Sequence, residues 1–127
     1  MTEEETGSVE EVARLALALP GVVQDQHVGT PDFRVGGKIF CTARTHQRLA
    51  MVKLPLEIQT AVISGHPEAI SPAAGAWGRG GSTLVRTDLV SADLLADLIV
   101  SAWRYGASKA PDGEELVAAY LANQQGE

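Results

Sequence analysis

Four short segments with the composition of β-strands follow one another between residues 22 and 54, and only a few residues separate each from the next. The tightest connection is Gly36-Gly37, where two adjacent glycines supply the positive φ angles that a two-residue hairpin needs. Connections this short join antiparallel neighbours, because a parallel crossover needs a dozen or more residues. The stretch therefore predicts an antiparallel meander of strands at 22–28, 32–35, 38–43 and 49–54.

Helical patterns lie on both sides of this meander. A helix is expected at 9–19, where Ser8 and Glu11 match a capping box, and Pro20-Gly21 ends it. Ser91 is a suitable N-cap for a strongly amphipathic helix at 92–106. Further elements are predicted as follows: a helix at 56–64, a loop at 70–81, a strand at 82–86 and a shorter helix at 114–124.

This order of elements predicts the α+β class, with one antiparallel sheet and helices packed mainly on one face. Residues 1–127 are expected to form a single domain, since 127 residues with 45% hydrophobic side chains suffice for one core. Residues 1–7 are expected to be disordered, and 107–127 to be a C-terminal helical extension. The acidic start, Met1-Thr2-Glu3-Glu4-Glu5, lacks the basic residues of a signal peptide, and no apolar run is long enough to span a membrane. We therefore expect a cytoplasmic protein.

Charge is distributed unevenly along the chain. The net charge is −6, but residues 15–86 carry seven Lys and Arg against four acids, whereas both ends are acidic. An acidic protein repels phosphates at long range, yet a basic surface within it can still hold them at contact. The middle of the chain is therefore where we expect any anion-binding surface.

The best candidates for such a surface lie on the hairpins. Arg34 and Lys38 flank the Gly36-Gly37 turn, and Arg48 and Lys53 belong to the next hairpin. Two basic hairpin tips could neutralise the phosphates of a nucleic acid. The alternative is that these side chains only form the solvated polar face of an antiparallel sheet.

Trp77 and Arg79 form a second candidate site. An exposed tryptophan beside a cation could stack on a base, as in proteins that bind single strands. The interpretation that we favour from the sequence is that Trp77 anchors the loop in the core.

The histidines and the single cysteine are weak candidates for chemistry. His27 could contact a ligand, although a structural hydrogen-bonded role is favoured, and no nucleophile accompanies it in a recognisable motif. His27, His46 and His66 are 19 and 20 residues apart, which is no metal-binding spacing. Cys41 lies within a predicted strand and is expected to be a buried structural thiol.

Three stretches resemble the MmcQ/YjbR family. They are Leu17 to Val22; His27 to Phe40, with its ordered His, Gly, Pro, Phe, Arg and Lys; and Pro72 to Gly81 around Trp77-Gly78, followed by a strand and a helix ending in Ala102-Trp103. The resemblance implies a compact α+β domain similar to the frataxin-like (CyaY-like) fold, and some members are described as DNA-binding proteins with a double-wing arrangement of hairpins. The chain departs from the family at Gly81-Ser82, where relatives often have a second tryptophan.

We therefore expect a binding domain without enzymatic activity or cofactor. DNA, contacted through the phosphates, is the first expected partner, and a small molecule or a protein is the alternative. A frataxin-like domain could also bind iron on an acidic helix face. The dense acidic run of this chain lies at its beginning, and we interpret it as a solvated terminus; it consists of Glu3, Glu4, Glu5, Glu10 and Glu11.

Overall fold

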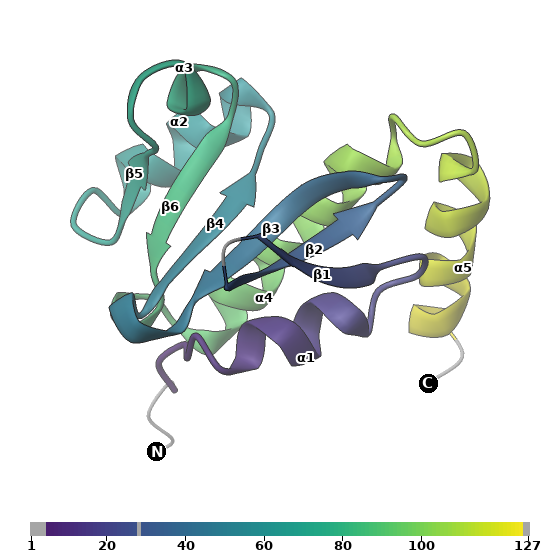
Figure 1. The fold of residues 1–127 in the computed structure, drawn as a ribbon, viewed down its shortest axis with the longest axis horizontal. Coiled ribbons are helices and arrows are strands. Elements are labelled where there is room, and N and C mark those ends of the chain that lie inside the picture. Colours follow the sequence, from purple (N-terminus) through teal and green to yellow (C-terminus); the bar gives the residue numbers. More distant parts are fainter. Residues whose placement is uncertain (1–4, 28, 126–127) are drawn as a thin grey trace.

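The computed structural model describes residues 5–27 and 29–125, and it contains a six-stranded antiparallel sheet in the order β1-β2-β3-β4-β6-β5 (Figure 1). The strands are β1 (Val23–His27), β2 (Thr30–Val35), β3 (Lys38–Arg44), β4 (Leu49–Lys53), β5 (Ile70–Pro72) and β6 (Ser82–Arg86). The helices are α1 (Glu11–Leu17), α2 (Leu56–Gly65), α3 (Gly75–Arg79), α4 (Ala92–Ala107) and α5 (Gly113–Gln125), with 3-10 turns η1 (Thr45–Gln47) and η2 (Thr87–Leu89). The predicted α+β class and the meander of the first four strands are confirmed.

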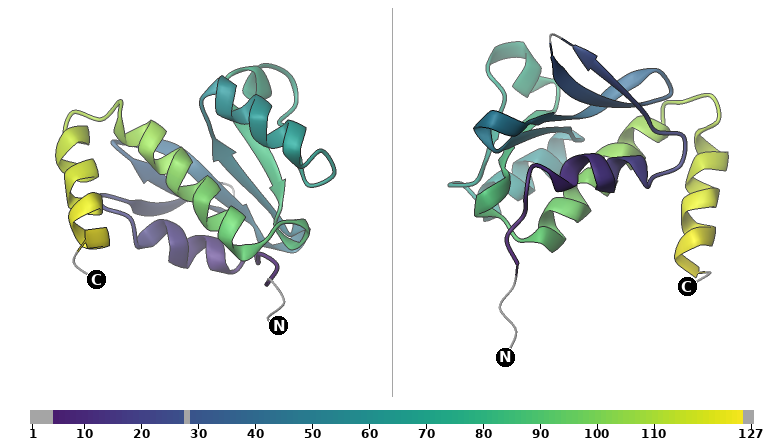
Figure 2. Two further views of the ribbon diagram at one scale, coloured as in Figure 1. Left: turned by 180° about the vertical axis from the view of Figure 1, so that it is seen from behind. Right: turned by 60° about the horizontal axis from the view of Figure 1, so that its bottom comes forward.

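The longest helix, α4, crosses one face of the sheet beside α1, and α2 covers the same face farther along (Figure 2). The core lies in this layer, where Phe33 and Phe40 of the sheet meet Ile99 and Trp103 of α4, all at most 1% exposed. Burying a large apolar side chain of this kind contributes roughly 1.5–3 kcal/mol. Among the described residues, no helix of this size covers the opposite face of β3, β4 and β6, which we call the open face (Figure 2).

A β-bulge lets the hairpin of β2 and β3 contribute two adjacent side chains to the core. The register shifts at Phe33/Arg34: Phe33 pairs with Cys41 and Arg34 with Ile39, so Phe40 has no partner between them. Phe40 and Cys41 are both buried, although neighbours in a regular strand point to opposite faces. The alternation of inward and outward side chains therefore fails in β3 at this point.

The segment 70–81, predicted to be a loop, instead contains strand β5 and the short helix α3. Its conformation depends on close backbone packing. A Cβ atom at Gly78 would lie 2.0 Å from the Ala73 carbonyl oxygen, and one at Gly81 would lie 2.3 Å from that of Leu54. Gly78 and Gly81, two of the glycines that suggested a loop, thus allow the backbones to approach each other closely.

The start of the chain also differs from expectation. Residues 1–4 lie outside the described residues, but Thr6 forms a β-bridge with Ser91, and the Gly7 amide donates to the Val90 carbonyl at 2.8 Å. The predicted capping box is wrong, because the Ser8 hydroxyl donates to Glu10 at 2.7 Å while Glu11 pairs with Arg14. This helix is also shorter than predicted.

Other predicted helix features are confirmed. The Ser91 hydroxyl caps α4 by accepting a hydrogen bond from the Leu94 amide at 3.0 Å. The C-terminal helix α5 packs on α4, where the Tyr120 and Trp103 rings lie 5.3 Å apart at 48°. No helix in the described part of the chain is both long and apolar enough to cross a membrane.

Candidate functional site

The open face presents two basic ends around an apolar middle. At one end, Arg44 of β3 and Arg86 of β6 are both cross-strand neighbours of Leu49 in β4. Cross-strand neighbours share a face of the sheet, and Leu49 alternates with the buried Ala50, so both arginines lie on the open face.

The middle and the far end of this face follow from the same register. Met51 pairs with Leu84 and Thr42, and Lys53 pairs with Ser82 at the far end. Met51 and Leu84 are half-buried, whereas both arginines are exposed. The open face is therefore an apolar strip between Arg44 and Arg86 on one side and Lys53 on the other.

These three cations are not neutralised within the described part of the chain. The ion pairs found there join Arg14 to Glu11, Arg34 to Asp32 and Arg48 to Asp88, and none of them involves Arg44, Lys53 or Arg86. Strands β3, β4, β5 and β6 contain no acidic residue. Asp25 of β1 and Asp32 of β2 are cross-strand neighbours on this side of the sheet, and Asp32 lines one cavity together with Arg44.

Arg34 lies on the open side but is engaged by a neighbour. Its Nε donates to one carboxylate oxygen of Asp32 at 2.9 Å, and its Nη2 donates to the other at 3.2 Å. This hydrogen bonding raises the pKa of the Arg34 guanidinium. Asp32 is 1% exposed, and a buried carboxylate needs such a partner. Arg34 therefore has a structural role in this hairpin.

The predicted hairpin surface does not form as one patch. Lys38 pairs with Val35, whose side chain is buried toward the helices, so Lys38 leaves the sheet on the side opposite to Arg34. Arg48 follows η1 with a φ of 52° and lies 3.8 Å from Asp88. Of the four hairpin cations, only Arg34 and Lys53 share the open side.

Trp77 is exposed, and the interpretation that it anchors the core is wrong. Its side chain is 74% accessible on α3, and Arg79 of the same helix is also exposed. The residue that anchors this segment is Gln59 of α2, which is 7% exposed. Its amide nitrogen lies 3.0 Å from the Gly78 oxygen, 3.2 Å from the Ser82 oxygen and 3.1 Å from Thr83 Oγ1.

The remaining candidates do not assemble into a site. The backbone of His27 pairs with Thr30 in β1, but its side chain is outside the described part. Cys41 is fully buried, and burial raises the pKa of its thiol to about 12, which makes it a poor nucleophile. Within residues 5–27 and 29–125 no cluster of three His, Cys, Asp or Glu side chains could hold a metal ion.

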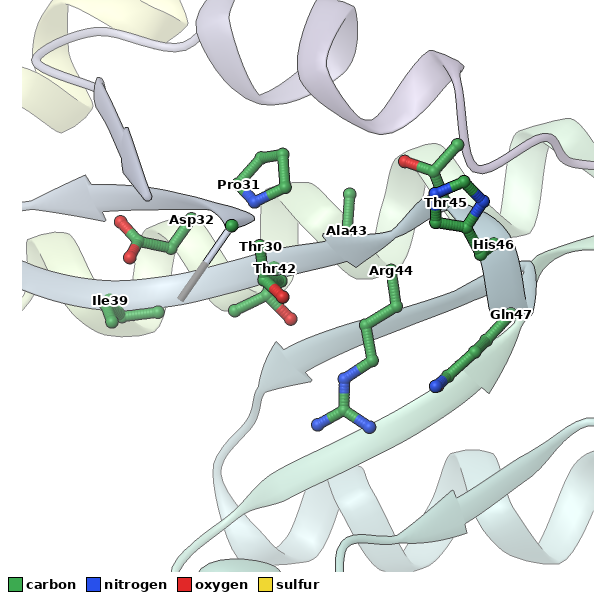
Figure 3. A pocket seen from close by; sticks show the side chains of 11 residues that line it. Thr30, Pro31, Asp32, Ile39, Thr42, Ala43, Arg44, Thr45, His46 and Gln47 are labelled. Atoms are coloured by element: carbon green, nitrogen blue, oxygen red, sulfur yellow. The ribbon is translucent and has the colours of Figure 1, made fainter. Parts of the chain in front are cut away.

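A cavity of about 620 Å³ lies where the end of the β1–β2 hairpin approaches β3 and η1. Figure 3 shows Arg44 and Gln47 extending on the same side of β3, with Asp32 and Thr42 farther along the strands. The cavity is open to solvent and continues onto the open face through Arg44. Its lining could hold a polar or anionic group beside that guanidinium.

Arg44, Arg86 and Gln59 were not among the residues predicted from the sequence to form a site. The two arginines lie on strands that are far apart in the chain, and only the pairing of β6 with β4 brings them into one row. Period-two alternation within each strand would have placed them on the polar side, but not beside each other.

Comparison with known proteins supports the fold. The YjbR family model matches residues 17–105. The chain is also similar to the crystal structure of Deinococcus radiodurans protein DR2400, with family-model domain DUF419, at a TM-score of 0.71 and 19% identity over 82% of this chain and 81% of that one. No curated protein matches the chain. Since the family model covers well over half of the residues, the chain belongs to the YjbR family.

Proposed function

We propose that this protein is a binding domain for nucleic acid, which contacts phosphates with Arg44, Lys53 and Arg86 of the open face. The observation that carries the proposal is that these three cations share a face and make no ion pair with a described residue. Lys and Arg side chains that neutralise phosphates supply most of the affinity in non-specific nucleic-acid binding. This surface replaces the hairpin tips as the expected contact.

The spacing of the cations favours a polymer over a single anion. Arg44 and Arg86 flank one strand, which puts their backbones about 10 Å apart, and Lys53 is four residues from their row, about 13 Å along β4. A lone phosphate can touch only one or two of these groups. A strand of nucleic acid carries a charge on every nucleotide and can touch all three.

The proposal contains no catalytic step. Cys41, the single cysteine of the chain, is buried, so its thiol offers no accessible nucleophile to a bound partner. The net charge of −6 supports modest affinity, because the acidic ends of the chain oppose the approach of a polyanion.

Fluorescence anisotropy with labelled single-stranded and duplex DNA at 50 and 200 mM salt tests this proposal. With three phosphate contacts, the affinity for a single strand should fall about 20-fold between these concentrations. In Arg44→Ala/Arg86→Ala one contact remains, so affinity should be lower at 50 mM salt and should fall only about threefold.

A matched control removes the same charge elsewhere. Arg104→Ala/Lys109→Ala changes one cation in the last turn of α4 and one just after the helix, and this variant should keep the steep dependence on salt. Lys38→Ala tests the hairpin tip and should have little effect. Equal losses in both double variants would mean that only net charge matters, and the open face would then not be the site.

The cavity at η1 favours a second candidate, a small anionic ligand held by Arg44 beside Gln47. Such a ligand would raise the melting temperature of the wild-type protein but not of Arg44→Ala. Arg86 does not line the cavity, so Arg86→Ala should still respond to this ligand. Both substitutions would instead weaken the binding of a nucleic acid that crosses the open face.

A further inference from the structure

Helix α3 holds an exposed tryptophan on a rigid support. Besides the Gln59 amide, two backbone hydrogen bonds of 2.9 Å fix the segment, from Ala73 to the Ser82 oxygen and from Leu54 to the Gly81 oxygen. Thr83 Oγ1 also donates to the Gly81 oxygen at 2.9 Å. An exposed indole on a well-bonded support keeps its ring available at little entropic cost, because only two side-chain torsions must be ordered.

The surroundings of this tryptophan favour an anionic, flat partner. From residue 69 to residue 87 the chain carries Arg79 and Arg86 and no acid. The segment ends at Ser82, the cross-strand neighbour of Lys53, so α3 lies at the Lys53 end of the open face. In Figures 1 and 2, α3 and the β1–β2 hairpin both project on the open side of the sheet.

We propose that Trp77 is a stacking platform for an unpaired base, which makes the domain selective for single-stranded nucleic acid; this inference rests on the proposed function. A strand held by Lys53 and Arg86 can continue toward α3, where the Trp77 ring would accept a base and Arg79 a phosphate. Bases in a duplex already stack on each other, so only an unpaired base has a free face for the indole. Stacking is indifferent to sequence, because every base has such a face.

The test titrates the protein with three ligands of equal length at 50 mM salt: oligo(dT), the corresponding abasic strand and a duplex. The chain has two tryptophans, and Trp103 is 0% exposed, so fluorescence quenching reports on Trp77. We expect quenching by oligo(dT) and none by the abasic strand. Oligo(dT) should also bind more tightly than either of the other ligands.

Three variants complete the experiment. Trp77→Ala should weaken oligo(dT) binding about tenfold and leave abasic-strand binding unchanged, whereas Trp77→Phe should retain most of the affinity. Leu89→Ala removes another exposed apolar side chain, 50% accessible, and serves as the matched control. Because Trp77 is exposed, the melting temperature of Trp77→Ala should stay at the wild-type value.

The outcomes separate the two proposals. Equal binding of oligo(dT) and the abasic strand, unaffected by Trp77→Ala, overturns the stacking platform and leaves phosphate contact in place. Binding that depends on Trp77 but not on Arg44 and Arg86 overturns the open-face contact and retains stacking. Failure of all three ligands to bind at 50 mM salt overturns both.

Discussion

Cys41 lies in the core with no accessible surface, and burial raises the pKa of its thiol to about 12. Its burial agrees with its position inside a predicted strand. In the unfolded chain the same thiol loses its proton near pH 8.5. A folded-state pKa above the unfolded value means that the folded protein keeps a proton that the unfolded chain releases.

This difference predicts a loss of stability at high pH. Below pH 8.5 the protonated thiol of Cys41 makes its full contribution to the free energy of unfolding. This contribution decreases as pH rises toward 12, by about 1.4 kcal/mol per pH unit above 8.5. Urea unfolding at pH 8 and pH 10 would measure it. Cys41→Ala should be less stable than the wild type at both pH values, because the substitution leaves a cavity. Its free energy of unfolding should, however, decrease less between pH 8 and pH 10 than that of the wild type. Equal pH dependence in the two proteins would contradict the prediction.

Trp77 was assigned wrongly from the sequence because local residues do not determine its exposure. A tryptophan in a segment rich in Gly and Ala can either fill the core or lie outside it. Gly78 decides between these, since its close approach to the Ala73 oxygen turns α3 so that the glycine is buried and the indole is not. This backbone contact produces no periodic pattern of residues in the sequence, so the exposure of Trp77 could not be predicted from such a pattern.

At the level of elements, strands were easier to predict than the segment between β5 and β6. The Gly36-Gly37 turn and the short connections between strand-like segments are local signals, and they placed three hairpins correctly. Helix α3 depends instead on Gln59, which lies 19 residues from its partner Gly78. A buried polar side chain that links distant elements leaves no periodic signal in the sequence.

We therefore expect Gln59→Ala to destabilise the protein by about 2 kcal/mol, because buried carbonyls of Gly78 and Ser82 lose a donor. Urea denaturation would measure this change in the free energy of unfolding. Thr60→Ala, at the exposed neighbouring position of α2, should change stability by less than about 0.5 kcal/mol. A similar small effect for Gln59→Ala would show that α3 does not depend on this amide.

On the scale of the molecule, α5 completes the end of the core, although it lies beyond residues 17–105 that the family model matches. Trp103 Nε1 donates to the Pro20 oxygen at 2.9 Å, and Tyr120 covers its ring. Leu116 of the same helix lies against Gly21, where a Cβ atom would come within 2.8 Å of it. One indole thus links the segment that follows α1 to the last helix.

Tyr120→Ala should lower the free energy of unfolding by about 2 kcal/mol, from lost apolar burial and lost ring contact with Trp103. The near-ultraviolet circular dichroism of Trp103 should change as well. Leu121→Ala, 42% exposed on the same helix, should cost well under 1 kcal/mol. If the two variants unfold alike, α5 contributes no specific packing.

The site was harder to predict than the fold because it depends on contacts between distant parts of the chain. The fold class could be predicted from the order of helices and strands, and each of these elements has a local signal in the sequence. The open face depends on β6 returning to pair with β4, which places Arg86 in one row with Arg44. Arg34 and Lys38 are close in the sequence, but their side chains lie on opposite faces of the sheet because of their register in the β2–β3 hairpin.

The short strand β5 has a consequence for how this protein can associate. Pro72 has no amide hydrogen, and the Ile70 amide is already bonded to the His66 oxygen at 2.9 Å. Ser71 pairs with Leu84 between the hydrogen-bonded pairs Ala69/Arg86 and Ala73/Ser82, so its amide points toward β6 and not beyond the sheet. That edge is closed to an incoming chain. Strand addition, whether by a second copy during aggregation or by an extended peptide, would have to occur at β1, where Asp25 and its charge limit such pairing.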